Sequence, residues 1–171
     1  MTISLAALVV GAATALSAST AFGHRSVAAC TGGQLAGSFV AVPGSAGAGN
    51  IVYKLTLKNT STRPCTLTGL PAGQLLGKAK QKLATHIHAA HPGQLAAILV
   101  TLVPGDSTYA TARFSPDVPG TGEQTIGQCE PKAYWLRVRA RGGGTTTVKA
   151  LPETPVCEHG ALSFSAYSQA G

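Results

Sequence analysis

The stretch that decides the fold reads Ile51-Val52-Tyr53-Lys54-Leu55-Thr56-Leu57-Lys58-Asn59. Ile, Tyr, Leu and Leu occupy every second position, and the residues between them are mostly polar. Because successive side chains of a β-strand point to opposite faces, this alternation predicts a strand with one buried and one exposed face. The following Asn59-Thr60-Ser61 is typical of a turn, since these short side chains bond their own backbone. We therefore expect a half-buried strand over 51–59.

Weaker patterns of the same kind lie on both sides of this segment. Apolar runs bounded by Gly, Pro or short polar residues predict further strands. These runs lie at 35–42, from Cys65 to Leu70, at 96–102, over Ser107–Phe114, at 134–141 and from Leu162 to Ala166. Pro104-Gly105 predicts a hairpin turn between two of them, and the stretch after Leu75 is less ordered. About seven to eight strands without an amphipathic helix predict an all-β, immunoglobulin-like antiparallel β-sandwich.

The composition supports one all-β domain. The chain has 171 residues, 44% of them hydrophobic and 11% charged, and this length is enough to bury a core without a metal. Its 21 Gly and 10 Pro are scattered without a period, which fits many short strands joined by turns. We predict a single β-sandwich domain over 30–171.

The amino terminus predicts export. Residues 3–18 form a nearly uninterrupted apolar run that is short for a membrane span, which needs ~20 residues. Ala21-Phe22-Gly23 suits a signal peptidase, so we predict a signal peptide over 1–23 and a short linker over 24–29. A membrane-anchoring helix is the alternative. A second alternative is lipidation of Cys30 after a loose lipobox, although His24 and Arg25 separate that box from the apolar run.

Four cysteines, Cys30, Cys65, Cys129 and Cys157, are an even number in a chain that we expect to be exported, which predicts two disulfides. Their wide spacing does not favour zinc ligation or thioredoxin-like chemistry. Three connectivities are possible. We favour Cys30 with Cys65 and Cys129 with Cys157, although spacing alone does not choose among the three.

A family resemblance covers nearly the whole chain after the signal segment. The residues that carry it are Gly47-Ala48-Gly49-Asn50, Tyr53, Leu55, Leu57, Asn59, Ser61, Cys65, Leu67, Gly69, Pro71, Leu102, Pro104, Gly105, Ser107, Ala110, Ala112, Arg113, Phe114, Cys129, Leu136, Val138, Cys157, Gly160 and Leu162. This pattern resembles the domain-of-unknown-function family numbered 4232, which is mainly actinobacterial. The resemblance implies an exported or lipid-anchored envelope protein with a β-sandwich, supports the favoured cysteine pairing and implies no activity. The chain departs from the family at 85–92 and at the Arg-x-Arg-x-Arg run.

Three histidines, His86, His88 and His91, lie close together in the first of these departures. Two imidazoles separated by one residue share a face of a strand, and a third from the adjoining turn would complete a set for Zn²⁺ or Cu²⁺. The segment contains no carboxylate to orient the rings. The surrounding Ala, Pro and Gly favour a mobile, solvated loop. A metal site is therefore the less favoured interpretation, and no cofactor is predicted.

Positive charge is the second candidate feature. The chain has 13 basic and 6 acidic residues, a formal net charge of +7. Two sets alternate with other residues, so each would share one face of an extended strand: Lys78, Lys80, Lys82 and Arg137, Arg139, Arg141. A solvated face is the simplest interpretation. The more specific hypothesis is a surface that binds anionic cell-wall polymer or lipid headgroups, with membrane attachment only if Cys30 carries lipid. Nucleic acid is not favoured, because export removes that partner and only Trp135 interleaves the Arg run.

No pattern in the chain predicts catalysis. The six acidic residues lie mostly in predicted turns, and no nucleophile elbow, zincin helix or phosphate-binding loop is present. With all four cysteines bridged, no thiol nucleophile would remain. We therefore predict a noncatalytic, secreted or cell-envelope module that binds an anionic polymer. The alternative is a protein-protein interaction domain of the cell surface.

Overall fold

The computed structural model describes residues 26–93 and 98–169, and these residues form an all-β domain. The predicted signal peptide over 1–23 and the beginning of the predicted linker lie outside the described residues. The elements are η1 Gly32–Gln34, β1 Leu35–Ala41, β2 Ile51–Asn59, β3 Cys65–Thr68, β4 Ala72–Leu76, β5 His86–Ala89, β6 Leu99–Leu102, β7 Ser107–Phe114, β8 Ala133–Arg139, β9 Thr145–Thr154, α1 Cys157–Gly160, β10 Ala161–Phe164 and β11 Ser168–Gln169. In the described part of the chain, no helix is long and apolar enough to cross a membrane.

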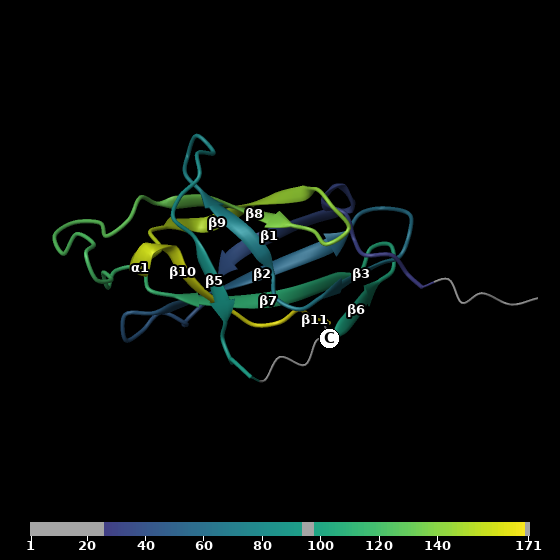
Figure 1. Ribbon diagram of the computed structural model, residues 1–171, viewed down its shortest axis with the longest axis horizontal. Helices are drawn as coiled ribbons and strands as arrows, with labels where there is room; N and C mark the ends of the chain where they lie inside the picture. Colours follow the sequence, from purple (N-terminus) through teal and green to yellow (C-terminus); the bar gives the residue numbers. More distant parts are fainter. Residues whose placement is uncertain (1–25, 94–97, 170–171) are drawn as a thin grey trace, which may run out of the picture.

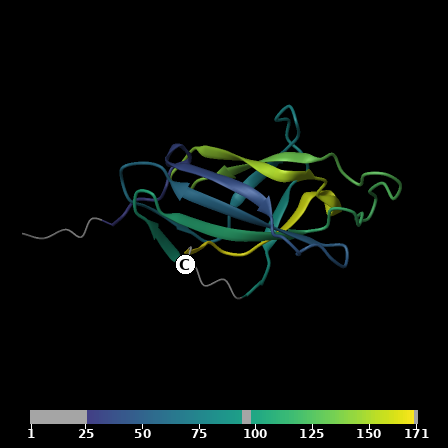
Figure 2. The same ribbon diagram turned by 180° about the vertical axis from the view of Figure 1, so that it is seen from behind.

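One sheet wraps around the core. Its strand order is β4-β8-β9-β1-β2-β7-β10-β5, with β11 added beside β7. The segment between β4 and β5 bonds back to β4, where the Leu83 N–H donates to the Leu75 carbonyl at 3.0 Å. The two ends of the strand order are thus joined, and the sheet is a nearly closed barrel rather than two separate layers. Figures 1 and 2 show the strands around a common core, with β3 and β6 at one end and α1 at the other.

The predicted antiparallel sandwich is therefore correct as an all-β fold but wrong in its pairing. Two neighbouring pairs, β1 with β9 and β10 with β5, are parallel. Residues 26–93 and 98–169 contain eleven strands, more than the seven to eight predicted. The additional strands are short or lack a clean apolar alternation. Their positions are therefore determined by pairing with neighbouring strands rather than by their own sequence.

The segments β2 and β7 are the best-predicted strands. Both have the predicted bounds and pair antiparallel, with Leu55 opposite Ala110. Tyr53, Leu55 and Leu57 are fully buried, as the alternation predicted. The ring of Phe39 on β1 lies 5.0 Å from that of Tyr53 and 6.3 Å from that of Phe164. Each such side chain contributes roughly 1.5 to 3 kcal/mol of burial free energy.

A two-stranded sheet of β3 and β6 covers one end of the barrel. The run 96–102 was predicted as a buried strand that forms a hairpin with Ser107–Phe114. Instead β6 pairs with β3, and only Val100 and Leu102 of its four residues are buried. Leu99 is exposed because β6 alternates its side chains between the core and solvent. Residues 96 and 97 lie outside the described part of the chain.

Strand β9 and the segment before Cys30 carry pairings that the sequence did not indicate. β9 lies between β8 and β1 and connects the two halves of the sheet. Upstream of Cys30, Ala29 forms a bridge to Thr66 on β3. The end of the predicted linker therefore contacts the folded domain.

Candidate functional site

Both predicted disulfides are present. Cys30 bonds to Cys65 and Cys129 bonds to Cys157, and no cysteine is free in the described chain. Cys30 and Cys65 are buried in the core cluster near β3, whereas the second bond joins the loop before β8 to α1. Disulfides persist in oxidising environments, so the pairing indicates an extracellular or otherwise oxidising compartment.

Arg137 and Arg139 lie on the outward side of β8. Their neighbours Leu136 and Val138 are buried, so the alternation of the strand turns both guanidinium groups away from the core. Arg137 is paired with Gln74 on β4 and with Thr147 on β9. Two of the three predicted arginines therefore share one face of a strand. Arg141 lies in the turn after β8 and is exposed.

The three lysines do not form the predicted strand face. Residues 78–82 form the turn between β4 and β5, where Lys80 adopts a positive φ of 62°. The Lys80 ammonium lies 5.3 Å from the centre of the Trp135 ring, in cation-π contact. The Trp135 Nε1 is buried without a hydrogen-bond partner. Lys149 on β9 is paired with Trp135 and is exposed, so a second cation lies on the neighbouring strand.

Lys82 joins the two arginines around one hollow. The hollow has a volume of about 220 Å³ and is also lined by Gln74 and Thr145. No carboxylate is among its lining residues. In the described chain both ion pairs involve His159, and no lysine or arginine nitrogen lies within 4.0 Å of a carboxylate oxygen. We call Lys82, Arg137 and Arg139 the basic hollow.

The three predicted histidine ligands do not converge. His86 and His88 lie on β5, a strand rather than the predicted loop, and both are exposed on one face. The His88 Nε2 is 2.6 Å from the Ser163 Oγ on the parallel strand β10. Within the described residues, the groups with three ligand atoms within 4.8 Å of one another do not include His86, His88 or His91.

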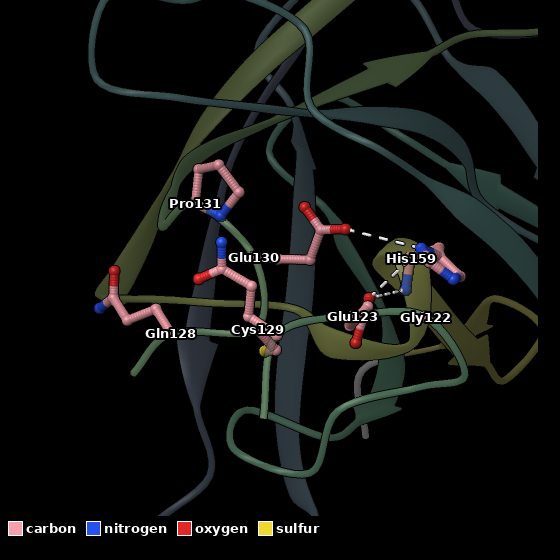
Figure 3. Close-up of a pocket in the computed structure, with 8 residues that line it drawn as sticks. Gly122, Glu123, Gln128, Cys129, Glu130, Pro131 and His159 are labelled. Atoms are coloured by element: carbon pink, nitrogen blue, oxygen red, sulfur yellow. Dashed lines mark hydrogen bonds and ion pairs between the residues drawn. The ribbon is translucent and has the colours of Figure 1, made fainter. Parts of the chain in front are cut away.

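A second pocket lies in the loops at the α1 end of the barrel. It has a volume of about 550 Å³, and its lining includes Glu123, Gln124, Gln128, Glu130 and His159. Figure 3 shows the two carboxylates and the imidazole ring within this space. We call it the loop pocket.

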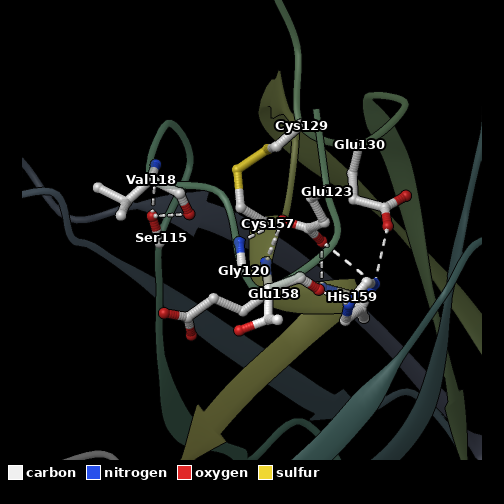
Figure 4. A network of polar contacts seen from close by, with 10 residues as sticks. Ser115, Val118, Gly120, Glu123, Cys129, Glu130, Cys157, Glu158 and His159 are labelled. Atoms are coloured by element: carbon white, nitrogen blue, oxygen red, sulfur yellow. Dashed lines mark hydrogen bonds and ion pairs between the residues drawn. A yellow bond between two sulfur atoms is a disulfide. The ribbon is translucent and has the colours of Figure 1, made fainter. Parts of the chain in front are cut away.

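Glu123 is the anchor of the loop pocket. Its side chain is only 2% exposed, and its Oε2 accepts the N–H groups of Gly120 at 2.6 Å and Glu158 at 2.9 Å. Its Oε1 accepts the N–H of His159. Burial on its own would raise the pKa of Glu123, but these backbone donors and the nearby His159 outweigh it and lower that pKa. Figure 4 shows how this one carboxylate joins the loop at Gly120 to the backbone of Glu158 and His159.

His159 is the functional candidate that sequence reasoning missed. It lies 36 residues from Glu123, and neither residue sits in a recognisable motif. The sequence signal for His159 is its position two residues after Cys157. The disulfide from Cys157 to Cys129 brings the neighbouring Glu130 close to His159.

The family model for a domain of unknown function, DUF4232, matches residues 30–168. The chain belongs to the DUF4232 family. This match covers most of the chain, and both disulfides and both pockets lie within it. Comparisons with curated proteins and with solved structures give no match. Membership of DUF4232 brings no known activity, so a function has to be argued from the geometry.

Proposed function

We propose that this DUF4232 protein is a noncatalytic module of the cell envelope that binds an anionic cell-wall polymer through its β4-β8-β9 face. The observation that carries the proposal is the basic hollow, where Lys82, Arg137 and Arg139 surround one space without a carboxylate. Three like charges around a hollow repel one another, and an anion placed between them removes that repulsion.

The surroundings of the basic hollow suit a chain of anionic groups better than a single ion. Lys80 lies over the Trp135 ring and Lys149 is the cross-strand neighbour of Trp135, so both add positive charge near β8. Thr145 and Thr147 add exposed hydroxyl groups opposite the arginines. An extended polymer with regularly spaced phosphate or carboxylate groups would contact several of these positions together. Arginine would contribute most, because its planar guanidinium forms paired hydrogen bonds with phosphate or carboxylate.

Export and envelope attachment belong to the same proposal. The two disulfides support an oxidising location, and the signal peptide over 1–23 would deliver the chain there. The Cys30 sulfur is bonded to Cys65, so it is not free to carry a lipid. We therefore propose retention through the polymer rather than through lipidation of Cys30. The immunoglobulin-like arrangement and the actinobacterial source stay predictions.

Binding to inorganic polyphosphate and to isolated cell wall tests the proposal. The variant Arg137→Gln with Arg139→Gln should bind roughly tenfold more weakly or worse, and raising the salt from about 50 to about 500 mM should release the wild type. The control Lys58→Gln with Arg113→Gln removes the same charge from exposed positions on β2 and β7 and should bind normally. If both variants bind polyphosphate and cell wall equally weakly, the net charge of the protein determines binding, and the proposed site is contradicted.

A protein partner at the cell surface is the second candidate function. One observation favours it: Ile98, Leu99 and Val103 are 53%, 63% and 49% exposed around β6. A stoichiometric surface complex that survives high salt and tolerates the arginine double variant would support this alternative.

A further inference from the structure

The loop pocket brings two carboxylates to one imidazole nitrogen. The Glu123 Oε1 lies 3.5 Å from the His159 Nδ1, and the Glu130 Oε1 lies 3.8 Å from the same atom. All three atoms lie within 4.8 Å of one another. We propose that Glu123, Glu130 and His159 bind a divalent transition metal ion, with Zn²⁺ the ion that best suits these ligands. This site is separate from the basic hollow and does not depend on polymer binding.

The orientation of the His159 ring favours a metal over a simple hydrogen bond. Its Nε2 lies 3.0 Å from the Thr121 carbonyl oxygen. A carbonyl only accepts, so the Nε2 carries the proton, and in the neutral ring the Nδ1 presents a lone pair to the two carboxylates. Metal-ligating histidines commonly donate their other N–H to a backbone carbonyl in this way, which fixes the tautomer.

The spacing of the three atoms fits shared coordination. Distances of 3.5 and 3.8 Å between the His159 Nδ1 and the carboxylate oxygens are long for N–H···O hydrogen bonds, which measure about 2.7 to 3.2 Å. Ligands at ~2.0 to 2.2 Å from a tetrahedral Zn²⁺ are themselves about 3.3 to 3.6 Å apart. An ion between the three atoms therefore requires that these atoms, all within 4.8 Å of one another, close to tetrahedral spacing.

The covalent frame holds the ligands before any ion arrives. Glu130 follows Cys129 and His159 lies two residues after Cys157, so the disulfide places both ligands side by side. Glu158 and His159 have φ values of 57° and 58°, which turn both of their N–H groups onto Glu123. Preorganisation of this kind lowers the ordering cost of binding.

The charge of the loop pocket also favours a cation. No lysine or arginine is among its lining residues, and His159 is the side chain that lies beside both carboxylates. Three protein ligands leave a fourth position of a tetrahedral ion free, and the pocket of about 550 Å³ around them has room for a further ligand. The site is therefore of the open kind, in which water or an incoming ligand completes the coordination.

Calorimetry with Zn²⁺ on the intact, disulfide-bonded protein tests the site. We expect one ion per chain in the wild type, binding at least roughly tenfold weaker in Glu130→Gln, and no binding in His159→Asn. Asn is the suitable replacement, because it tolerates the positive φ of His159 better than Ala does. Circular dichroism of each variant confirms that it remains folded.

The control and a second measurement locate the ion. His88→Ala removes an exposed imidazole on β5 and should leave Zn²⁺ affinity unchanged. Nuclear magnetic resonance of the imidazole rings should show Zn²⁺ shifting the His159 signals and not those of His86 or His91. A wild type that binds no Zn²⁺ at millimolar concentration overturns the proposal. Binding that is lost in His88→Ala but kept in folded His159→Asn overturns it as well.

Discussion

Removing the two disulfides one at a time should separate their structural roles. The bonds close segments with sequence separations of 35 residues for Cys30–Cys65 and 28 residues for Cys129–Cys157. In the chain-entropy model their loss costs about 3.8 and about 3.6 kcal/mol, nearly the same. The surroundings differ, because Cys30 and Cys65 are buried in the core and Cys129 is not. Counting each buried sulfur as about one methylene adds a further ~1 to 2 kcal/mol for Cys30 and Cys65, and about 1 kcal/mol for Cys157, which is also fully buried.

We therefore expect Cys30→Ala with Cys65→Ala to lower the free energy of unfolding by roughly 5 to 6 kcal/mol, against roughly 4 to 5 for Cys129→Ala with Cys157→Ala. Urea unfolding followed by the fluorescence of Trp135 measures both. The second variant should also bind Zn²⁺ more weakly while still folded, because its ligands lose their covalent frame. A larger loss for the Cys129–Cys157 variant, or a loss below about 1 kcal/mol in either one, would refute this account of what the bonds do.

Two further predictions concern the core. Phe39→Ala should lower the free energy of unfolding by about 3 to 5 kcal/mol, because the ring is 1% exposed and packs on Tyr53. The control Val40→Ala should lower it only slightly, because Val40 is 38% exposed. Thermal unfolding measures both variants. Burial raises the pKa of Tyr53 to about 12, so the folded state favours the neutral phenol. The stability that this preference contributes is present below pH ~10 and is lost as the pH rises through about 12. In urea titrations, Tyr53→Phe should lose less stability than the wild type over that pH interval. Some loss should remain, because burial also raises the pKa of Tyr167. Equal losses of stability in the variant and the wild type would contradict the role of Tyr53.

The segments that were predicted correctly are those in which apolar and polar side chains alternate, because this alternation indicates which face is buried. β2 and β7 alternate over nine and eight residues, and both have the predicted bounds. β9 was missed although it is the longest strand, because it begins in a Thr run after three glycines and contains Pro152. Its position is determined by β8 and β1 on either side, and a single sequence does not reveal such distant partners.

The same reasoning explains what the sequence revealed of the two sites. Arg137 and Arg139 were found because they are two residues apart on one strand, and strand geometry alone places them on one face. Lys82 lies more than 50 positions from them and reaches the basic hollow only because its turn folds back along β4. Glu123, Glu130 and His159 have no local pattern at all.

Position along the barrel separates the two proposed activities. The cations of the basic hollow come from the outward faces of paired strands, so a polymer would meet a rigid surface whose spacing is set by the sheet. The ligands of the loop pocket come from loops that the sheet does not order, and Cys129–Cys157 supplies the missing constraint. The Cys129→Ala with Cys157→Ala variant should therefore lose Zn²⁺ affinity without losing affinity for polyphosphate, because β8, which holds Arg137 and Arg139, is hydrogen-bonded to β4 and β9 without that bond.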